Sequence, residues 1–402
     1  MAPRFETRLD QAENFTAFTA RPIGRRTFLI VTGGIAAAAA LAPRLAWAKK
    51  AARLAGTPSL LQPWSLATGT PEGAFETARA LISAAVLAPS EWNTQPWRFE
   101  VEDATVRLVT EPARLLPSTD PDGRGAMVSQ GAALENLLVA ARAYGLRPTV
   151  TYMPREGANG VVAEVVWATG DVRRDRALFA AIPLRRTNRR GYDGRGILPE
   201  QRAQLVAQVP EGLSLHWMDD KDAIKSVAKL AHDAAHEQAE DHRVASEQFA
   251  WMRFGDDADK SGDGVPIDNL ELGMVTSWMA GRYFNPDSWL SRFGPEHVAR
   301  EARDGLRSAG ALALLCTPRR DPTQWLMGGQ AFERFALQAT ALDLALQPVS
   351  APIERPRWRA PLLRAFDAPG EEPLMLLRLG HAKRPEPTPR RGVPLVATFR
   401  MS

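Results

Sequence analysis

The sequence contains little cysteine, no large excess of one charge and no apolar run long enough to cross a membrane. The single Cys316 excludes an internal disulfide, and its place in the apolar stretch "ALALLCTP" predicts a buried strand residue rather than a nucleophile. Beyond residue 48 the chain carries 44 basic and 43 acidic residues, so we expect no nucleic-acid partner. Its 402 residues suffice for two ordinary domains.

The first 48 residues have the pattern of an export signal. Arg25 and Arg26 precede an Ala/Gly-rich apolar run over residues 28–42, and Ala46 and Ala48 form an A-x-A cleavage pattern. The run is shorter than the roughly 20 residues of a membrane helix. We therefore expect a twin-arginine signal, cleaved after Ala48, that directs the folded protein to the twin-arginine export machinery and the periplasm or another exported location.

A polar turn, "APSEWNTQPW" at 88–97, separates a helical segment from a strand-like one. An ordinary turn needs one proline or asparagine and some polarity. This turn instead holds Ser90, Asn93, Thr94 and Gln95 between two prolines, and all four side chains can form hydrogen bonds. The pattern therefore indicates a ligand-binding turn.

Two parts of the chain resemble each other. Residues 131–150 align with residues 329–349, matching Gly131 with Gly329 and Glu135 with Glu333. Each segment is an amphipathic helix between two strand-like stretches, which predicts two copies of one α+β unit. The alternative is a chance alignment of two amphipathic helices. The second copy lacks the polar turn and carries an arginine cluster, "RRTNRR", instead.

The arginine cluster suits a phosphate group. Arg185, Thr187 and Arg189 alternate along the chain, so an extended backbone turns all three side chains the same way. Guanidinium groups bind phosphate in bidentate fashion. A solvent-exposed charged face is the common alternative.

Together, "APSxxNxQPW", "RRTxR" and a central helix of small residues resemble the FMN-dependent nitroreductase family. The similarity is greatest to its twin-arginine-exported, Acg-like branch, in which one chain holds two nitroreductase-type halves. The resemblance covers about residues 75–402. It implies an α+β, nitroreductase-like fold of two pseudo-symmetric halves with mostly antiparallel sheets and packed helices. The halves would be residues 49–178 and 179–402, with a lid insertion at about 219–300.

The resemblance also implies a single FMN site shared between the halves, so that the chain would be a monomer that imitates the family dimer. The first half would supply the ledge for the flavin ring and ribityl chain, the second the phosphate grip, and the C-terminal segment two more basic residues. The cofactor-binding residues implied are Pro89, Ser90, Asn93, Gln95, Arg185, Thr187, Arg189, Arg390 and Arg391. Trp92 and Trp97 either cover the ring or belong to the core.

The implied activity is that of an exported oxidoreductase that passes hydride through flavin N5 to a small electron-poor acceptor. The electron donor would be NAD(P)H or another reductant. Because NAD(P)H is scarce outside the cytoplasm, the alternative is an FMN-binding storage or sequestering protein without turnover. A third possibility is a structural protein with a degenerate site. No residue of the sequence is identifiable as a catalytic acid.

Two stretches resemble metal sites without satisfying their patterns, so we expect no metal. His232 and His236 have the spacing of a zinc pair, but acidic neighbours favour a solvent-exposed helix face. Residues 257–268 resemble a calcium loop, but Pro266 stiffens its end. The positions that match the calcium loop are Asp257, Asp259, Ser261, Gly262 and Asp268. This stretch follows Trp251 and Arg253 and is a candidate lid.

Overall fold

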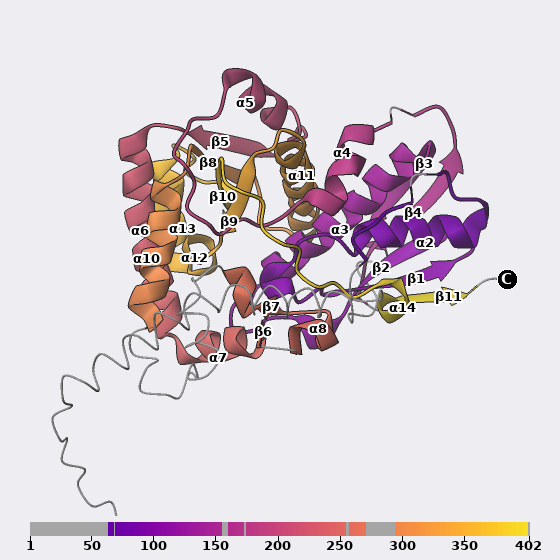
Figure 1. Ribbon diagram of the computed structural model, residues 1–402, viewed down its shortest axis with the longest axis horizontal. Coiled ribbons are helices and arrows are strands. Elements are labelled where there is room, and N and C mark those ends of the chain that lie inside the picture. The colour runs from indigo at the N-terminus through magenta and orange to yellow at the C-terminus, as the bar shows by residue number, and fades with distance from the viewer. Residues whose placement is uncertain are drawn as a thin grey trace, which may run out of the picture. The chain divides into compact units, whose positions relative to one another are not determined.

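The computed structural model describes residues 63–400, apart from residues 68, 155–159, 173, 255–256 and 271–293 (Figure 1). All the described residues belong to one compact unit, Thr57–Ser402. The predicted export signal at 1–48 lies outside the described residues. Within the described part of the chain, none of the helices combines the length and apolar character needed to cross a membrane.

Sheet A has five strands in the order β11-β1-β2-β4-β3, and all its neighbouring strands are antiparallel except β1 and β11. In β1, Trp97, Phe99 and Val101 are buried and alternate with exposed residues, as expected where a core covers one face of a sheet. The strands are β1 (Trp97–Glu102), β2 (Thr105–Thr110), β3 (Leu146–Tyr152), β4 (Val161–Thr169) and β11 (Ala397–Arg400). The helices of this region are α2 (Gly73–Ala85), α3 (Arg124–Ala143) and α4 (Arg176–Ala181).

Sheet B has four antiparallel strands in the order β5-β8-β10-β9. Both faces of β8 are covered. Ala313 and Leu315 join the core that contains α3 and α11, whereas Leu314 and Cys316 join a second core with α6. The strands are β5 (Ser214–Met218), β8 (Ala311–Thr317), β9 (Ala345–Val349) and β10 (Glu372–Gly380). The helices are α5 (Pro199–Val206), α6 (Lys221–Glu240), α10 (Gly294–Arg307), α11 (Pro322–Ala341), α12 (Ala351–Glu354) and α13 (Pro356–Ala365).

Helices α3 and α11 cross at a pair of glycines. A methyl group on Gly131 would collide with the carbonyl oxygen of Leu326, and one on Gly329 would collide with the carbonyl oxygen of Val128. These contacts are reciprocal, because on each helix the glycine lies three residues after the residue whose carbonyl faces the other glycine. The absence of a side chain at both positions lets the two helix backbones meet.

A group of short elements lies beside the two sheets. Strands β6 (Met252–Arg253) and β7 (Val265–Pro266) form a parallel pair, with helices α7 (His242–Ala250) and α8 (Asp257–Ser261) next to them in the chain. The predicted lid insertion therefore contains different kinds of structure. Helix α6 packs against α10 and buries one side in the second core. Residues 261–265, from the last residue of α8 to the first of β7, contribute nothing to that core, and we call them the 261–265 loop.

The C-terminal segment crosses from sheet B to sheet A. After β10 the chain passes the short helix α14 (Val393–Val396), and β11 then pairs in parallel with β1, so that Phe99 lies opposite Ala397. In Figure 1 the yellow β11 lies beside the indigo β1. This crossing carries Arg390 and Arg391 to the 88–97 loop, at the point where the chain enters β1.

The predicted α+β class, with mostly antiparallel sheets and packed helices, is confirmed. Cys316 is a buried strand residue, as its apolar context predicts. Trp97 is fully buried in the core between sheet A and its helices, which confirms the core alternative for that residue.

Candidate functional site

Five separate segments of the chain surround a pocket of about 480 Å³, a volume that includes its open mouth. We call it the arginine pocket, because four arginines line it. The lining residues are Trp64, Pro89, Ser90, Asn93, Arg185, Arg186, Thr187, Arg189, Val265, Asn269, Glu386, Thr388 and Arg390. All but two of the cofactor-binding residues predicted from the sequence are among them. The exceptions are Gln95 and Arg391.

The 88–97 loop has a strained backbone. Trp92, Asn93 and Gln95 adopt φ angles of 49°, 54° and 53°, a left-handed conformation that is uncommon outside glycine. Hydrogen bonds hold this shape: the Ser90 carbonyl accepts from the Asn93 amide at 3.0 Å, and the Ser90 hydroxyl accepts from the Gln95 amide at 2.9 Å. Strain of this kind persists only where its surroundings impose it, and it is concentrated at functional sites.

Asn93 lies between the pocket and two neighbouring segments. Its Nδ2 donates to the carbonyl oxygens of Gly264, at 2.7 Å, and Pro389, at 3.1 Å. Its Oδ1 is buried and makes no hydrogen bond to the described residues. A buried acceptor without a partner is unusual in a folded protein. The side chain therefore holds the pocket wall together and keeps one acceptor for a ligand.

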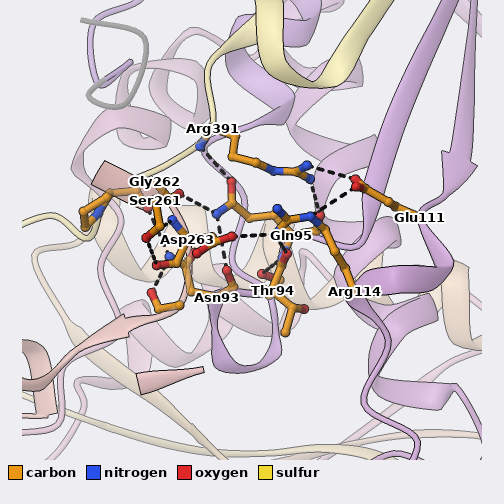
Figure 2. A network of polar contacts seen from close by, with 12 residues as sticks. Asn93, Thr94, Gln95, Glu111, Arg114, Ser261, Gly262, Asp263 and Arg391 are labelled. Atoms are coloured by element: carbon orange, nitrogen blue, oxygen red, sulfur yellow. Dashed lines mark hydrogen bonds and ion pairs between the residues drawn. The ribbon is translucent and has the colours of Figure 1, made fainter. Parts of the chain in front are cut away.

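Gln95 does not line the pocket, and Figure 2 shows its side chain between Gly262 and Arg391. Its Nε2 donates to the Gly262 carbonyl at 2.8 Å, and its Oε1 accepts from the Arg391 amide at 2.9 Å. Its side chain is fully buried. The structure therefore uses this amide to join the 261–265 loop and the C-terminal segment to the 88–97 loop.

Arg391 extends the same network. It pairs with Glu111 at 2.9 Å and donates to the carbonyl oxygens of Gln95, at 2.6 Å, and Trp97, at 3.2 Å. Burial lowers the pKa of its guanidinium, and neighbouring Arg114 lowers it further, while Glu111 partly opposes the shift. Arg391 thus stabilises the backbone at the start of β1.

The 261–265 loop is fixed by an acidic residue between two arginines. Asp263 pairs with Arg114 at 2.9 Å and with Arg253 at 2.8 Å (Figure 2). Burial alone would raise the pKa of Asp263, but the hydrogen bonds and charges of these arginines lower it overall. The Gly264 amide also donates to the Asn93 carbonyl at 3.2 Å. These contacts close the loop against the 88–97 loop.

The opposite wall of the pocket is strongly cationic. Arg185 is 3% exposed, and its Nε makes no hydrogen bond to the described residues. Burial and the neighbouring Arg185 and Arg186 charges lower the pKa of Arg390 well below its usual range. Burial, together with Arg185 and Arg384, lowers the pKa of Arg186 to about 10, so it stays charged at neutral pH. Such a concentration of positive charge favours an anionic ligand.

A buried carboxyl group lies beneath this wall. Glu333 of α11 is fully buried, with Oε1 at 3.4 Å from the Arg185 Nε, but neither atom makes a hydrogen bond within the part of the chain that the structure describes. Burial raises the pKa of Glu333 to about 8, although Arg185 and Arg390 oppose the shift. At neutral pH the carboxyl group is mostly protonated, so it leaves the charge of the arginines available to a ligand.

Trp64 is a pocket residue that the sequence analysis did not identify. Its ring lies between two guanidinium groups, with Arg186 at 4.2 Å and Arg390 at 5.2 Å from the ring centroid, and its Nε1 donates to the Thr388 carbonyl at 3.2 Å. Contacts of this kind stabilise cations over aromatic faces. The alternation of side chains along an extended segment also excluded Arg186 from the predicted site, although Arg186 lines the same pocket. No local pattern marks Trp64, because its partners lie far along the chain.

The two metal-like patterns of the sequence have other surroundings in the structure. His232 and His236 stack on α6 with ring centroids at 6.4 Å, and each contacts acidic side chains. Residues 257–261 form the short helix α8, and Asp263 pairs with arginines. Neither pattern belongs to the cluster of three potential metal ligands found among the described residues, which lies on sheet B.

The chain is similar in sequence to proteins that are named as nitroreductases. No family model matches the sequence. The protein named "Putative NAD(P)H nitroreductase Rv3131", from Mycobacterium tuberculosis, is 33% identical over 323 residues, which cover 79% of this chain and 89% of that protein. "Putative NAD(P)H nitroreductase acg", from the same organism, is 36% identical over 116 residues, 28% of this chain and 35% of that protein. A crystal structure of the FMN-dependent nitroreductase NfnB from Mycobacterium smegmatis in complex with NADPH aligns with a TM-score of 0.29 and 14% identity, over 52% of this chain and 94% of that one.

Proposed function

Because the chain belongs to the nitroreductase family, we propose that it is an FMN-binding oxidoreductase that reduces a small electron-poor acceptor. The observation that supports this most is the arginine pocket, which unites Ser90 and Asn93 of one segment with Arg185, Thr187 and Arg189 of another.

The residues of the pocket fit the two chemical ends of FMN. Arg185 has a buried Nε without a hydrogen bond to the described residues, and Thr187 and Arg189 flank the same space, which suits a phosphate dianion. Asn93 offers its unpaired Oδ1, and Ser90 its hydroxyl, to a polar ring edge or to ribityl hydroxyls. Bound FMN would supply hydride transfer through N5. The chain itself binds, orients and neutralises charge.

The donor and the location are further parts of the proposal. We infer that NAD(P)H or another reductant supplies the electrons and that the twin-arginine signal exports the folded protein. Replacing Arg25 and Arg26 together by lysine tests export directly. We expect the variant to stay in the cytoplasm while the parent chain is recovered from the periplasm, and equal distribution of the two would overturn the inference.

We also propose that residues 49–178 and 179–402 are two nitroreductase-type halves within one chain. The reciprocal contacts of Gly131 and Gly329 support this arrangement, because they relate α3 and α11 by an approximate two-fold exchange. The proposal predicts a monomer with one FMN. Light scattering of the purified chain, combined with flavin released by heat, gives both values. A dimer with two flavins per pair would instead indicate that the chains pair as in ordinary relatives.

A storage or sequestering protein is the second candidate function. It is favoured by the 261–265 loop, which closes against Asn93 and contributes Val265 next to the pocket wall. Turnover distinguishes the two functions. The parent protein is mixed with NAD(P)H and a nitroaromatic or quinone acceptor, and oxidation of the nicotinamide is followed. Steady-state oxidation supports the enzyme, whereas bound FMN without oxidation supports storage.

The site assignment is tested by Arg185→Ala. We expect FMN affinity to fall by about 10- to 100-fold, because a charged hydrogen bond contributes about 1.5–3 kcal/mol. Arg195→Ala is the matched control, since Arg195 is exposed and pairs with Asp193 outside the pocket. Equal FMN affinity of the two variants would contradict the assignment.

A further inference from the structure

A second cluster of reactive side chains lies on sheet B, and none of its members lines the arginine pocket. It comprises His216 of β5, Cys316 of β8 and Glu371, directly before β10. Ser214 pairs with Cys316 across the sheet, and His216 lies two residues beyond Ser214. Residues directly opposite each other, and residues two apart on one strand, share a face of a sheet. The strand register therefore gathers these side chains on one face.

The donor atoms of the cluster are close enough to share an ion. The imidazole nitrogen, the thiol sulfur and a carboxylate oxygen all lie within 4.8 Å of one another. His216 Nε2 lies 3.1 Å from Glu371 Oε1, and the Ser214 hydroxyl donates to the other oxygen of the same carboxylate. Nitrogen, sulfur and oxygen ligands in such a set suit Zn²⁺ and related ions.

We propose that His216, Cys316 and Glu371 bind a divalent transition metal ion of the zinc type. The fourth position is left to water or to the Ser214 hydroxyl, as in zinc sites with three protein ligands. The three ligands do not line the arginine pocket, so we expect the ion to bind whether or not FMN is bound.

An ion can reach the cluster from the edge of the sheet. β5 is the edge strand of sheet B. The side chains of His216 and Glu371 are 24% and 29% exposed, whereas Cys316 is buried beneath them. The ion therefore enters on the histidine and carboxylate side and meets the sulfur last.

Metal binding displaces a proton from the thiol. On binding, a sulfur–metal bond replaces the sulfur–hydrogen bond, and one proton is released to solvent without any oxidation or reduction. The bound ion would fasten the edge strand β5 to β8 and to the segment that leads into β10.

The alternative explanation is that the cluster binds no metal. Ser214, His216 and Cys316 would then serve only as hydrogen-bond donors to the carboxylate of Glu371. Cobalt separates the two explanations, because a thiolate bound to Co²⁺ gives a sulfur-to-metal charge-transfer band. The full chain is purified, freed of metal with a chelator and titrated with Co²⁺, and difference spectra remove the absorption of any flavin. We expect the band to appear at one Co²⁺ per chain and to disappear when Zn²⁺ is added.

The variants assign the ligands. Cys316→Ser should lose the band, and His216→Asn and Glu371→Gln should weaken Co²⁺ binding by at least the roughly 10- to 100-fold that loss of a supporting residue costs. His232→Ala/His236→Ala is the matched control and should bind as the parent does. No band in the parent, or a band that persists unchanged in Cys316→Ser, would overturn the proposal. If Cys316→Ser fails to fold, parent-like Co²⁺ affinity in the His216→Asn and Glu371→Gln variants would overturn it equally.

Discussion

Two acidic residues at equivalent positions of the central helices have opposite surroundings. Glu135 of α3 pairs with Arg142 at 2.8 Å and with Arg334 at 3.0 Å, so its charge is balanced where the helices meet. Glu333 of α11 is fully buried and pairs with Arg185 at 3.4 Å, and neither of its oxygens accepts a hydrogen bond from the described residues. Both lie four residues after the glycine at which their helix crosses the other.

The surroundings of Glu135 stabilise the fold, whereas Glu333 lies next to the proposed ligand site. Folding tends to satisfy buried polar groups, and the atoms left unsatisfied in a native structure call for an explanation. Around Glu135 the ion pairs are complete within the protein. Around Glu333 the unsatisfied Arg185 faces the arginine pocket, where an anion can complete its hydrogen bonds. The positions four residues after the two crossing glycines therefore stabilise the fold on one helix and lie next to the proposed binding site on the other.

If the crossing of α3 and α11 is symmetric, substitution of either of its two glycines should lower the unfolding free energy by a similar amount. Gly131→Val and Gly329→Val each place a side chain against a backbone carbonyl that cannot move aside, so we expect a loss of about 3 kcal/mol or more in unfolding free energy. Urea denaturation measures this, with Gly191→Val as the control at an open position. A large loss at one glycine and none at the other would disprove the equivalence.

The two acids should differ when their charge is removed. Glu135→Gln disturbs two ion pairs and is expected to cost about 2 kcal/mol at neutral pH. Glu333→Gln is expected to raise the unfolding free energy there by about 1–3 kcal/mol, because Glu333 must take up a proton on folding at neutral pH whereas glutamine needs none. Thermal and urea unfolding of both variants provide the comparison, and equal costs would contradict it.

Glu333 should also make stability depend on pH. Its pKa is raised from 4.5 to about 8 on folding, so its contribution is fully present below pH 4.5 and is lost as the pH rises toward 8. Above about pH 8 the carboxylate also competes with a phosphate for Arg185. FMN affinity should therefore be about tenfold weaker at pH 9 than at pH 7. Flavin fluorescence titrations measure this, and Glu333→Gln should show nearly equal affinities at the two pH values.

The smallest effect is expected at the 261–265 loop. Asp263→Asn removes the charge between Arg114 and Arg253, and we expect a loss of about 1 kcal/mol and faster hydrogen exchange of the Gly264 amide. Because folding lowers the pKa of Asp263 below 3.8, its contribution is present above that pH and lost as the pH falls through the folded value. Asp257→Asn is a control on the same segment. Unchanged exchange at Gly264 would show that the ion pairs do not hold the loop.

The sequence predicted the parts of the site that are encoded locally. Polar residues between prolines marked the 88–97 loop, and alternating arginines marked the 185–189 segment, because each pattern is complete within a few residues. Gln95 was predicted to bind the cofactor; in the structure it does not line the pocket, and its side chain bonds to Gly262 and Arg391. Contacts across more than a hundred residues decide such roles, and they leave no periodicity in the sequence. The position of Trp64 between Arg186 and Arg390 could not be predicted for the same reason.

The late arrival of the C-terminal segment sets the order in which the site forms during synthesis. Arg390 donates to the carbonyl oxygen of Ala88, 302 residues earlier in the chain, at 3.2 Å. At about 5–20 residues per second, the ribosome needs on the order of 15–60 s to make the intervening chain. The 88–97 loop therefore leaves the ribosome long before its partner exists, and a ligand that needs both can be captured only after residue 390 has been made. If the protein is exported in its folded state, loading falls between the synthesis of residue 390 and passage across the membrane.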